Sequence, residues 1–198
     1  VDKGSVCVNG VSLTVVEPSE GMNRRAAAHL AGSPVPIRSV PGAGEKLPFA
    51  DASFDLVVSR LAPHHFSNLK HALNEIRRVL RSRGRLVIDD RSVPEDDFVD
   101  ACMNELDWYH DESHVRQYRP SEWRKMLSEA GFVVEGAEPY NKLRPLTSLT
   151  ANVSEENVRK IYARLAGLKE EEQQKLGLTE INGEPYLNHW YVLLSAHL

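Results

Sequence analysis

Short apolar runs rich in β-branched residues recur along the chain, and longer stretches with a helical spacing of apolar residues separate them. An apolar run of about four to eight residues, bounded by turn-forming or charged residues, is typical of a buried strand. The predicted strands are Val11–Val16, Ile37–Val40, Phe54–Ser59, Leu86–Ile88, Phe132–Val134 and Trp190–Leu194. Each is short enough to cross a sheet once.

The stretches between these strands predict amphipathic helices. The clearest follows Ser67, its expected N-cap, and Gly84 is expected to end it. The other predicted helices run from Ser19 to Ala31, Glu95 to Leu106, Pro120 to Ala130, Ser154 to Ala166 and Glu170 to Leu176. Strands that alternate with helices predict one α/β domain over residues 1–198 with a mostly parallel sheet. Such sheets bind ligands at the carboxyl ends of their strands.

Composition narrows the class of protein. The 198 residues are 41% hydrophobic and 26% charged, enough apolar material for one sizeable core. A net charge of −4 argues against a general binder of nucleic acid or anionic membranes. No apolar run approaches the roughly 18 residues of a membrane span, and no signal peptide is evident, so a cytoplasmic protein is expected. Cys7 and Cys102 are too few for a disulfide framework or a cysteine zinc site.

Two pairs of histidines invite a catalytic or metal-binding interpretation. His64 and His65 follow the strand that ends at Ser59, where a general base or a metal ligand would be well placed. Adjacent histidines usually point in different directions, which favours a loop anchor for one of them. His110 and His114 would share a helix face, but no third ligand is evident. We therefore expect no metal, and a histidine-based metal hydrolase is the most remote alternative.

Two other strand ends suggest a nucleotide-like ligand. Glu17 directly follows the first predicted strand, where a carboxylate can accept both hydroxyls of a ribose. The alternative is an acid favoured by the dipole of the next helix. Small residues at 42–44 let a flat ligand approach the backbone, and Leu47–Phe49 can exclude water from it. A simple turn is the alternative there.

At these residues the chain resembles a known family. The segment Gly42–Val58, GAGEKLPFADASFDLVV, is similar to class I S-adenosylmethionine-dependent methyltransferases, especially the ubiquinone and menaquinone biosynthesis type. The likeness spans about Val11–Leu198 through SRLAPHHF, ALNEIRRVLRSRGRLVIDD, ESHVRQYRPSEWRKMLSEAGF and GLTEINGEPYLNHWYVLLSA. It implies a Rossmann-like sheet, mostly parallel with an antiparallel last strand, and helices on both faces. It also implies that residues 91–131 form a helical insertion on the substrate side.

The resemblance implies S-adenosylmethionine as the cofactor and assigns residues to it. Glu17, with Pro18 beside it, would hold the ribose hydroxyls, and Met22 would lie near the adenine. The other implied cofactor residues are Asp2 and Gly4 on the first loop, Ala43, Gly44 and Glu45 on the adenine side, and Ser59, Arg60 and Leu61 beside the methionine. The family often has Asp where Ala43 stands, which removes one contact to the adenine amine. Methyl transfer needs alignment more than a covalent group, so no catalytic residue is assigned.

The front of the chain departs from the family pattern. The family's first strand ends in a D-x-G-x-G-x-G turn and a helix, whereas here only Asp2 and Gly4 match. Fifteen positions from Asp2 to Glu17 are too few for the loop, helix and second strand. Residues 1–10 are therefore expected to form an incomplete cofactor loop with weak or undetectable binding. Missing residues, a loop without fixed structure, and a degenerate methyltransferase that has lost its ligand are all compatible with this.

The expected function is methyl transfer from S-adenosylmethionine to a small-molecule acceptor. The alternative is a non-catalytic binding protein with the same fold, and the shortened glycine motif is the feature that separates the two. The acidic balance of the chain disfavours a nucleic-acid acceptor. The expected partners are thus a small methyl acceptor and, as an open alternative, a second copy of the chain in a homodimer.

Overall fold

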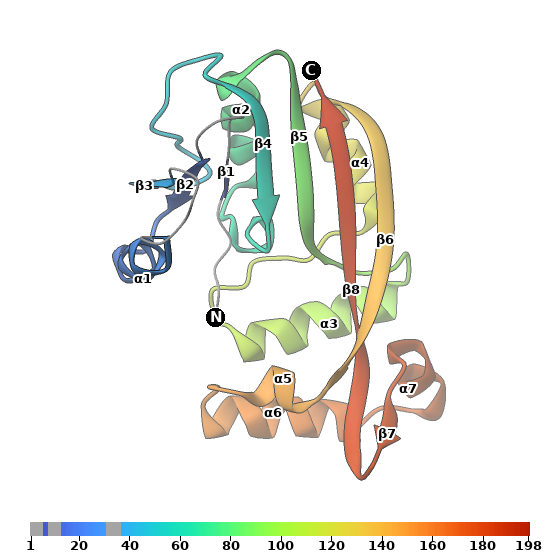
Figure 1. Cartoon of the computed structure of the whole chain (residues 1–198). Helices are drawn as coiled ribbons and strands as arrows, with labels where there is room; N and C mark the ends of the chain where they lie inside the picture. The colour runs from blue at the N-terminus through green and yellow to red at the C-terminus, as the bar shows by residue number, and fades with distance from the viewer. Residues whose placement is uncertain (1–5, 8–12, 31–36) are drawn as a thin grey trace.

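Eight strands form one mixed sheet in the computed structural model, which describes residues 6–7, 13–30 and 37–198 (Figure 1). Their order is β3-β2-β1-β4-β5-β8-β6, with β7 paired to β8. The bounds are β1 Val6–Cys7, β2 Leu13–Glu17, β3 Ile37–Pro41, β4 Phe54–Arg60, β5 Leu80–Ser92, β6 Val133–Pro145, β7 Thr179–Ile181 and β8 Glu184–His197.

The prediction of a mostly parallel sheet is wrong, because two strands run against their neighbours. Only β2–β3 and β4–β5 are parallel among the described pairs, whereas β1 is antiparallel to β2 and β4. Five residues separate β1 from β2, and a parallel connection needs about a dozen or more. The last strand, β8, is antiparallel to β5, β6 and β7, which confirms its predicted direction.

The pattern found six of the eight strands, missed the short strands β1 and β7, and underestimated the length of β5, β6 and β8. The prediction that Gly84 ends a helix is wrong, since that helix stops at Val79 and β5 begins at the next residue. The β4–β5 register jumps from Leu80 to Arg85, so the residues between them bulge out of the ladder. Gly84 is needed inside this bulge, because a Cβ there would lie 2.7 Å from the Arg81 carbonyl oxygen.

The helices agree with the pattern to within a few residues. Their bounds are α1 Glu20–Leu30, α2 Leu69–Val79, α3 Asp97–His110, α4 Pro120–Glu129, α5 Thr147–Thr150, α6 Glu155–Ala166 and α7 Glu170–Leu176, with a 3-10 turn, η1, at Pro63–His65. Ser154 caps α6 as predicted, by accepting the backbone N–H of Asn157. For α2 the cap is Asn68 rather than Ser67. No helix in the described part of the chain is long and apolar enough to cross a membrane.

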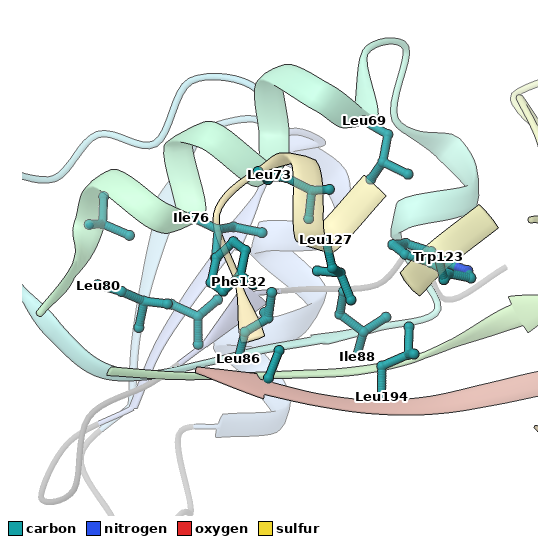
Figure 2. Close-up of a cluster of buried hydrophobic side chains, with 14 of the residues drawn as sticks. Leu69, Leu73, Ile76, Leu80, Leu86, Ile88, Trp123, Leu127, Phe132 and Leu194 are labelled. Carbon is teal, nitrogen blue, oxygen red and sulfur yellow. The ribbon is translucent and has the colours of Figure 1, made fainter. Parts of the chain in front are cut away.

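The main core lies between the sheet and two helices. In Figure 1, α2 and α4 both lie behind the central strands. Figure 2 shows their side chains Leu73, Ile76 and Leu127 meeting Leu86 on β5 and Leu194 on β8, and all five are buried. The face of the central strands that carries this core is therefore fixed by the apolar stripes of α2 and α4. Helices on both faces of the sheet stay a prediction.

A second core holds a helical layer against the lower end of the sheet. The layer consists of α3, α5, α6 and α7, beyond the carboxyl ends of β4 and β5 (Figure 1). Met103 and Leu106 of α3 pack there with Ile161 of α6, Leu176 of α7 and Leu187 of β8. Of the predicted insertion at 91–131, α3 belongs to this core and α4 to the main one. This layer covers the carboxyl ends of β4 and β5, where the candidate residues lie.

Candidate functional site

The end of β4 carries a strained residue. Leu61 follows the strand with φ at +48°, a left-handed conformation that costs a bulky residue energy. Its backbone N–H donates to the Asp89 carbonyl at 2.9 Å, which ties the turn to the neighbouring strand β5. Strain of this kind persists only where the surroundings enforce it. The next turn, η1, then points His64 and His65 toward the helical layer.

The first cavity lies beside β2 and β4 and has a volume of about 140 Å³. Its lining residues are Val16, Pro18, Gly42, Ala43, Gly44, Glu45, Ala62, His65, Phe66 and Ser67. The structure thus brings four predicted cofactor residues together, at 18 and 43–45. A Cβ on Gly44 would lie 2.7 Å from the Phe66 ring, so this wall depends on a glycine. Glu45 braces the same wall by accepting the Ser67 hydroxyl at 3.0 Å.

Glu17 lies at the end of β2, between two residues that line this cavity. Its side chain is only 3% exposed, and one carboxylate oxygen accepts the Ser19 N–H at 2.7 Å. Asn23 donates to the Glu17 carbonyl at 2.7 Å and fixes the strand end. Met22 is half-buried on α1 and is not among the lining residues. Glu17 is thus a held, buried carboxylate next to the cavity.

The three predicted residues at the end of β4 take different positions. Ser59 is fully buried, and its hydroxyl has no hydrogen-bond partner among the described residues. Arg60 is exposed and forms an ion pair with Asp89 at 3.1 Å. Leu61 lines the second cavity. Asp2 and Gly4 lie outside the described residues, as does most of the predicted incomplete loop at 1–10, of which only β1 is described.

The second cavity is larger and polar, with a volume of about 260 Å³ between the sheet edge and α3. It is lined by Leu61, His64, His65, Arg91, Asp107, His110, Asp111, His114, Arg144 and Tyr191. His65 lines both cavities, so they adjoin. An outer groove of about 440 Å³ along β5 and β6 shares Leu61, Arg144 and Tyr191 with the second cavity. The groove and the second cavity therefore adjoin at these three residues.

Each histidine of this cavity has one ring nitrogen anchored. Nδ1 of His65 donates to the Ser113 carbonyl at 3.0 Å, and Nδ1 of His110 to the Leu149 carbonyl at 2.8 Å. Nε2 of His114 faces the side-chain oxygen of Asn104 at 3.0 Å, and this oxygen already accepts a backbone N–H. That nitrogen therefore carries the ring proton. Nδ1 of the fourth ring, His64, is held by Asp90 at 2.6 Å.

The metal interpretation of these histidines finds no support in the geometry. The helix α3 ends at His110, so His110 and His114 do not share a helix face as the sequence spacing suggested. Across residues 6–7, 13–30 and 37–198, no three His, Cys, Asp or Glu side chains lie in a group that could hold a metal ion. The anchored rings instead form a hydrogen-bonding wall.

Burial and charge set the ionisation of the cavity wall. Burial disfavours a charged Asp107, but Arg91 and the neighbouring histidines outweigh it and hold the pKa of Asp107 below its usual range. Burial lowers the pKa of His114 to about 4. Behind the wall, burial lowers the pKa of His189 to about 3, and the nearby Arg91 adds to this shift. At neutral pH an Arg91–Asp107 ion pair therefore lies beside the neutral rings of His114 and His189.

Sequence reasoning missed several residues of the second cavity. Arg91 directly follows Asp89 and Asp90 at a strand end, and that position was the signal that could have found it. Arg144 and Tyr191 lie inside long strands and carry no local signal. Arg144 donates to the Tyr191 hydroxyl at 3.4 Å, and no carboxylate in the described ranges pairs with it.

Comparison with known proteins agrees with this geometry. Residues 5–88 match the family described as methyltransferase domain. A Bacillus halodurans protein described as a methyltransferase superposes with a TM-score of 0.87 and 29% identity, over 94% of this chain and 82% of that one. The fold is that of a methyltransferase. YcgJ of Bacillus subtilis superposes with a TM-score of 0.85 and 28% identity, over 93% of this chain and 81% of that one.

Two curated relatives match part of this methyltransferase fold. YcgJ of Bacillus subtilis, named an uncharacterized methyltransferase, is 39% identical over 105 residues, 53% of this chain and 42% of its own length. The uncharacterized protein YafE of Escherichia coli is 38% identical over 99 residues, 50% of this chain and 48% of its own length. The chain thus spans less than half of these relatives in the match. Together the matches support a methyltransferase fold for this chain.

Proposed function

We propose that this protein transfers the methyl group of S-adenosylmethionine to a small molecule bound in the second cavity. The observation that carries the proposal is the pair of adjoining cavities that share His65. One cavity lies at the strand ends where the resemblance places the cofactor, and the other opens to the outer groove. Two ligands held side by side are what a methyl transfer requires.

The described residues fit the adenosine part of the cofactor. The first cavity offers a narrow apolar space between Val16 and Phe66, with small residues at 42–44 that allow a flat ring to approach the backbone. The buried carboxylate of Glu17 beside it suits two ribose hydroxyls. In this assignment Ala43, Gly44 and Glu45 form the adenine side, and Ser59, Arg60 and Leu61 flank the methionine. Asp2 and Gly4 are proposed for the methionine end from the resemblance alone.

The chain's own contribution is alignment and exclusion of water. S-adenosylmethionine supplies a methyl group that a positively charged sulfur activates. His65 forms the wall common to both cavities, and the helical layer would cover the acceptor in the second cavity. A fixed approach of the two reactants converts a bimolecular step into an effectively unimolecular one.

The second cavity favours a small acceptor that carries an acid group. A volume of about 260 Å³ suits a small molecule. Arg91 is neutralised by Asp107, whereas Arg144 meets no carboxylate within the described residues and can pair with an acid on the acceptor. A cytoplasmic location and a homodimer stay predictions.

Calorimetric titration with S-adenosylmethionine and with S-adenosylhomocysteine tests the proposal. We expect weak but measurable binding of both, because the adenosine part of the site is present whereas the loop at 1–10 matches the family pattern only at Asp2 and Gly4. Release of S-adenosylhomocysteine on incubation with an acceptor would then demonstrate transfer. Binding without transfer to any acceptor would favour the non-catalytic binding protein, and no binding at all would overturn the cofactor assignment.

A further inference from the structure

One histidine of the second cavity differs from the others in its partner. Nδ1 of His64 lies 2.6 Å from one carboxylate oxygen of Asp90, and the backbone N–H of His64 donates to the other at 2.9 Å. Asp90 is fully buried at the carboxyl end of β5, whereas His64 lies in η1 after β4. The two adjacent strand ends thus hold ring and carboxylate in one orientation.

This orientation decides where the ring proton lies. A carboxylate can only accept hydrogen bonds, so in the contact between Asp90 and Nδ1 of His64 the proton lies on Nδ1. In the neutral ring Nε2 then has a lone pair. The His64 side chain is 11% exposed and lines the cavity, and no residue in the described ranges hydrogen-bonds its Nε2. A molecule in the cavity therefore meets a ring nitrogen that is ready to accept a proton.

We propose that His64 is the general base of the methyl transfer, that Asp90 is its positioning residue, and that the acceptor presents a hydroxyl group as its nucleophile. The inference rests on the proposed function. As the hydroxyl oxygen bonds to the methyl carbon, its O–H bond breaks and the proton passes to Nε2. The O–H electron pair stays on oxygen, and the carbon–sulfur pair of the donor stays on sulfur. The resulting imidazolium faces ionised Asp90.

The other three rings are less suited to this step. His65 and His110 donate their Nδ1 protons to backbone carbonyls, which are neutral and stabilise an imidazolium less than a carboxylate does. His114 uses Nε2 for Asn104, and its low pKa makes it a poor base at neutral pH. His64 combines a carboxylate partner with an Nε2 to which no described residue forms a hydrogen bond.

The charges around His64 are compatible with the role. The His65 and His114 rings lie against it, with centroids at 4.1 and 5.9 Å. The other ionisable groups that line the cavity are Arg91, Asp107, His110, Asp111 and Arg144. Arg91 is paired with Asp107, so Asp90 is the carboxylate that acts on His64 directly. When His64 takes the proton of the acceptor, its new positive charge therefore lies beside the buried carboxylate of Asp90.

Substitution Asp90→Asn gives a sharp test because only one orientation of the new side-chain amide satisfies its hydrogen bonds. The backbone N–H of His64 needs an acceptor, so the amide oxygen takes that side. The amide NH2 then faces Nδ1 and donates to it, which moves the ring proton to Nε2. The ring keeps its place but can no longer accept a proton from the cavity. A comparable substitution is known to cost a serine protease about 10⁴-fold in rate.

Nitrogen NMR of the histidine rings reads this state directly and needs no acceptor. With the His64 signal assigned from the His64→Gln spectrum, we expect Nδ1–H in the wild-type protein and Nε2–H in Asp90→Asn. A wild-type ring with its proton on Nε2, or no reversal in a folded Asp90→Asn protein, would overturn the proposal. If Asp90→Asn does not fold, the wild-type spectrum alone decides.

A kinetic comparison uses two probes that differ only in the need for a base. 4-Hydroxybenzoate must lose a proton on methylation, whereas 4-(dimethylamino)benzoate has none to lose. We expect His64→Gln and Asp90→Asn each to lower kcat for 4-hydroxybenzoate by about 10²–10⁴-fold. Neither substitution should change kcat for 4-(dimethylamino)benzoate. The deficit should shrink above the pKa of the phenol, since a phenolate needs no base. Equal loss on both probes, or transfer to the amine alone in wild type, would refute the role.

Failure of this inference is separable from failure of the proposed function. Calorimetry with S-adenosylhomocysteine reports on the first cavity, which His64 does not line. Binding together with an Nε2–H ring in wild type rejects the base and keeps the methyltransferase. If wild type methylates neither probe, the position of the ring proton decides for or against His64.

Discussion

The two cavities at the sheet edge differ in the segments and the residue types that line them. The first is lined by three short segments, at 16–18, 42–45 and 62–67, and owes its shape to glycines and a phenylalanine ring. The second draws its wall from η1, α3, the loop after α3 and the strands β5, β6 and β8. In the proposed function, the first would hold a flat ligand by shape, whereas the second would select its ligand by charge and hydrogen bonding. A fold can keep the first cavity constant while side chains in the second change the acceptor.

The largest effect is expected where the second cavity carries a buried ion pair. Asp107→Ala leaves Arg91 without its partner in a buried position and should lower the free energy of unfolding by about 3–5 kcal/mol. Urea denaturation measures this. The matched control is Asp97→Ala, which removes a side chain that is 96% exposed and should change stability by less than about 1 kcal/mol. Equal effects would mean that the ion pair contributes no more than a surface pair.

The second cavity should also make stability depend on pH. The folded-state pKa values of His114 and His189, about 4 and about 3, lie below the ordinary value of 6.5. Between these values the unfolded chain binds more protons, so the free energy of unfolding falls as pH drops through this window. From pH 6.5 to 5 each ring contributes a loss of about 2 kcal/mol. The titration of Asp107 lies lower, because its pKa is below 3.8.

Urea denaturation at pH 7 and pH 5 measures this dependence. His189→Gln should remove about half of the difference between the two pH values, since one of two rings no longer titrates. An unchanged difference in this variant would show that His189 does not drive the loss of stability in acid.

At the first cavity, stability should depend on the volume of the lining side chains instead of on their charge. Gly44→Ala places a Cβ 2.7 Å from the Phe66 ring, so the wall must shift, at a cost of about 1–3 kcal/mol in stability. Gly167→Ala is the matched control, because its nearest neighbour would lie at 3.6 Å and its φ is −81°. Thermal unfolding compares the two. Equal melting temperatures would show that the first cavity tolerates a larger wall.

Cofactor affinity should depend on Glu17. Glu17→Gln weakens the charge-assisted hydrogen bonds to the ribose and should reduce affinity for S-adenosylhomocysteine at least about tenfold, with little change in stability. Glu20→Gln removes an exposed carboxylate from the next helix and serves as the control. Unchanged affinity in Glu17→Gln would remove the ribose assignment.

The smallest effect is expected on addition of zinc to the protein. We predict that the histidines of the second cavity bind none, so zinc added and then dialysed away should leave no stoichiometric metal by elemental analysis. Near-stoichiometric zinc that disappears in His64→Ala would make the second cavity a metal site and would favour a hydrolase.

Local chemistry is enough to place much of this chain. The start of α6 follows from Ser154, which caps it, and from the acids of its first turn, and α7 has the bounds that the sequence predicted. The first cavity was also foreseen in part, because Pro18 and residues 43–45 belong to short segments with a recognisable pattern. The sequence by itself therefore determined most elements, the methyltransferase resemblance and one wall of the first cavity.

Only the tertiary structure decided strand direction, strand length and the second cavity. Gly84 has the pattern of a helix end, but it lies in a bulge of β5 between Leu80 and Arg85, which both pair with β4. His64 meets Asp90 across 26 positions, and Arg144 meets Tyr191 across 47. No local pattern encodes such contacts, because they arise from register between strands and from packing of the helical layer. Sequence places a residue at a strand end, and the fold decides which partner it meets there.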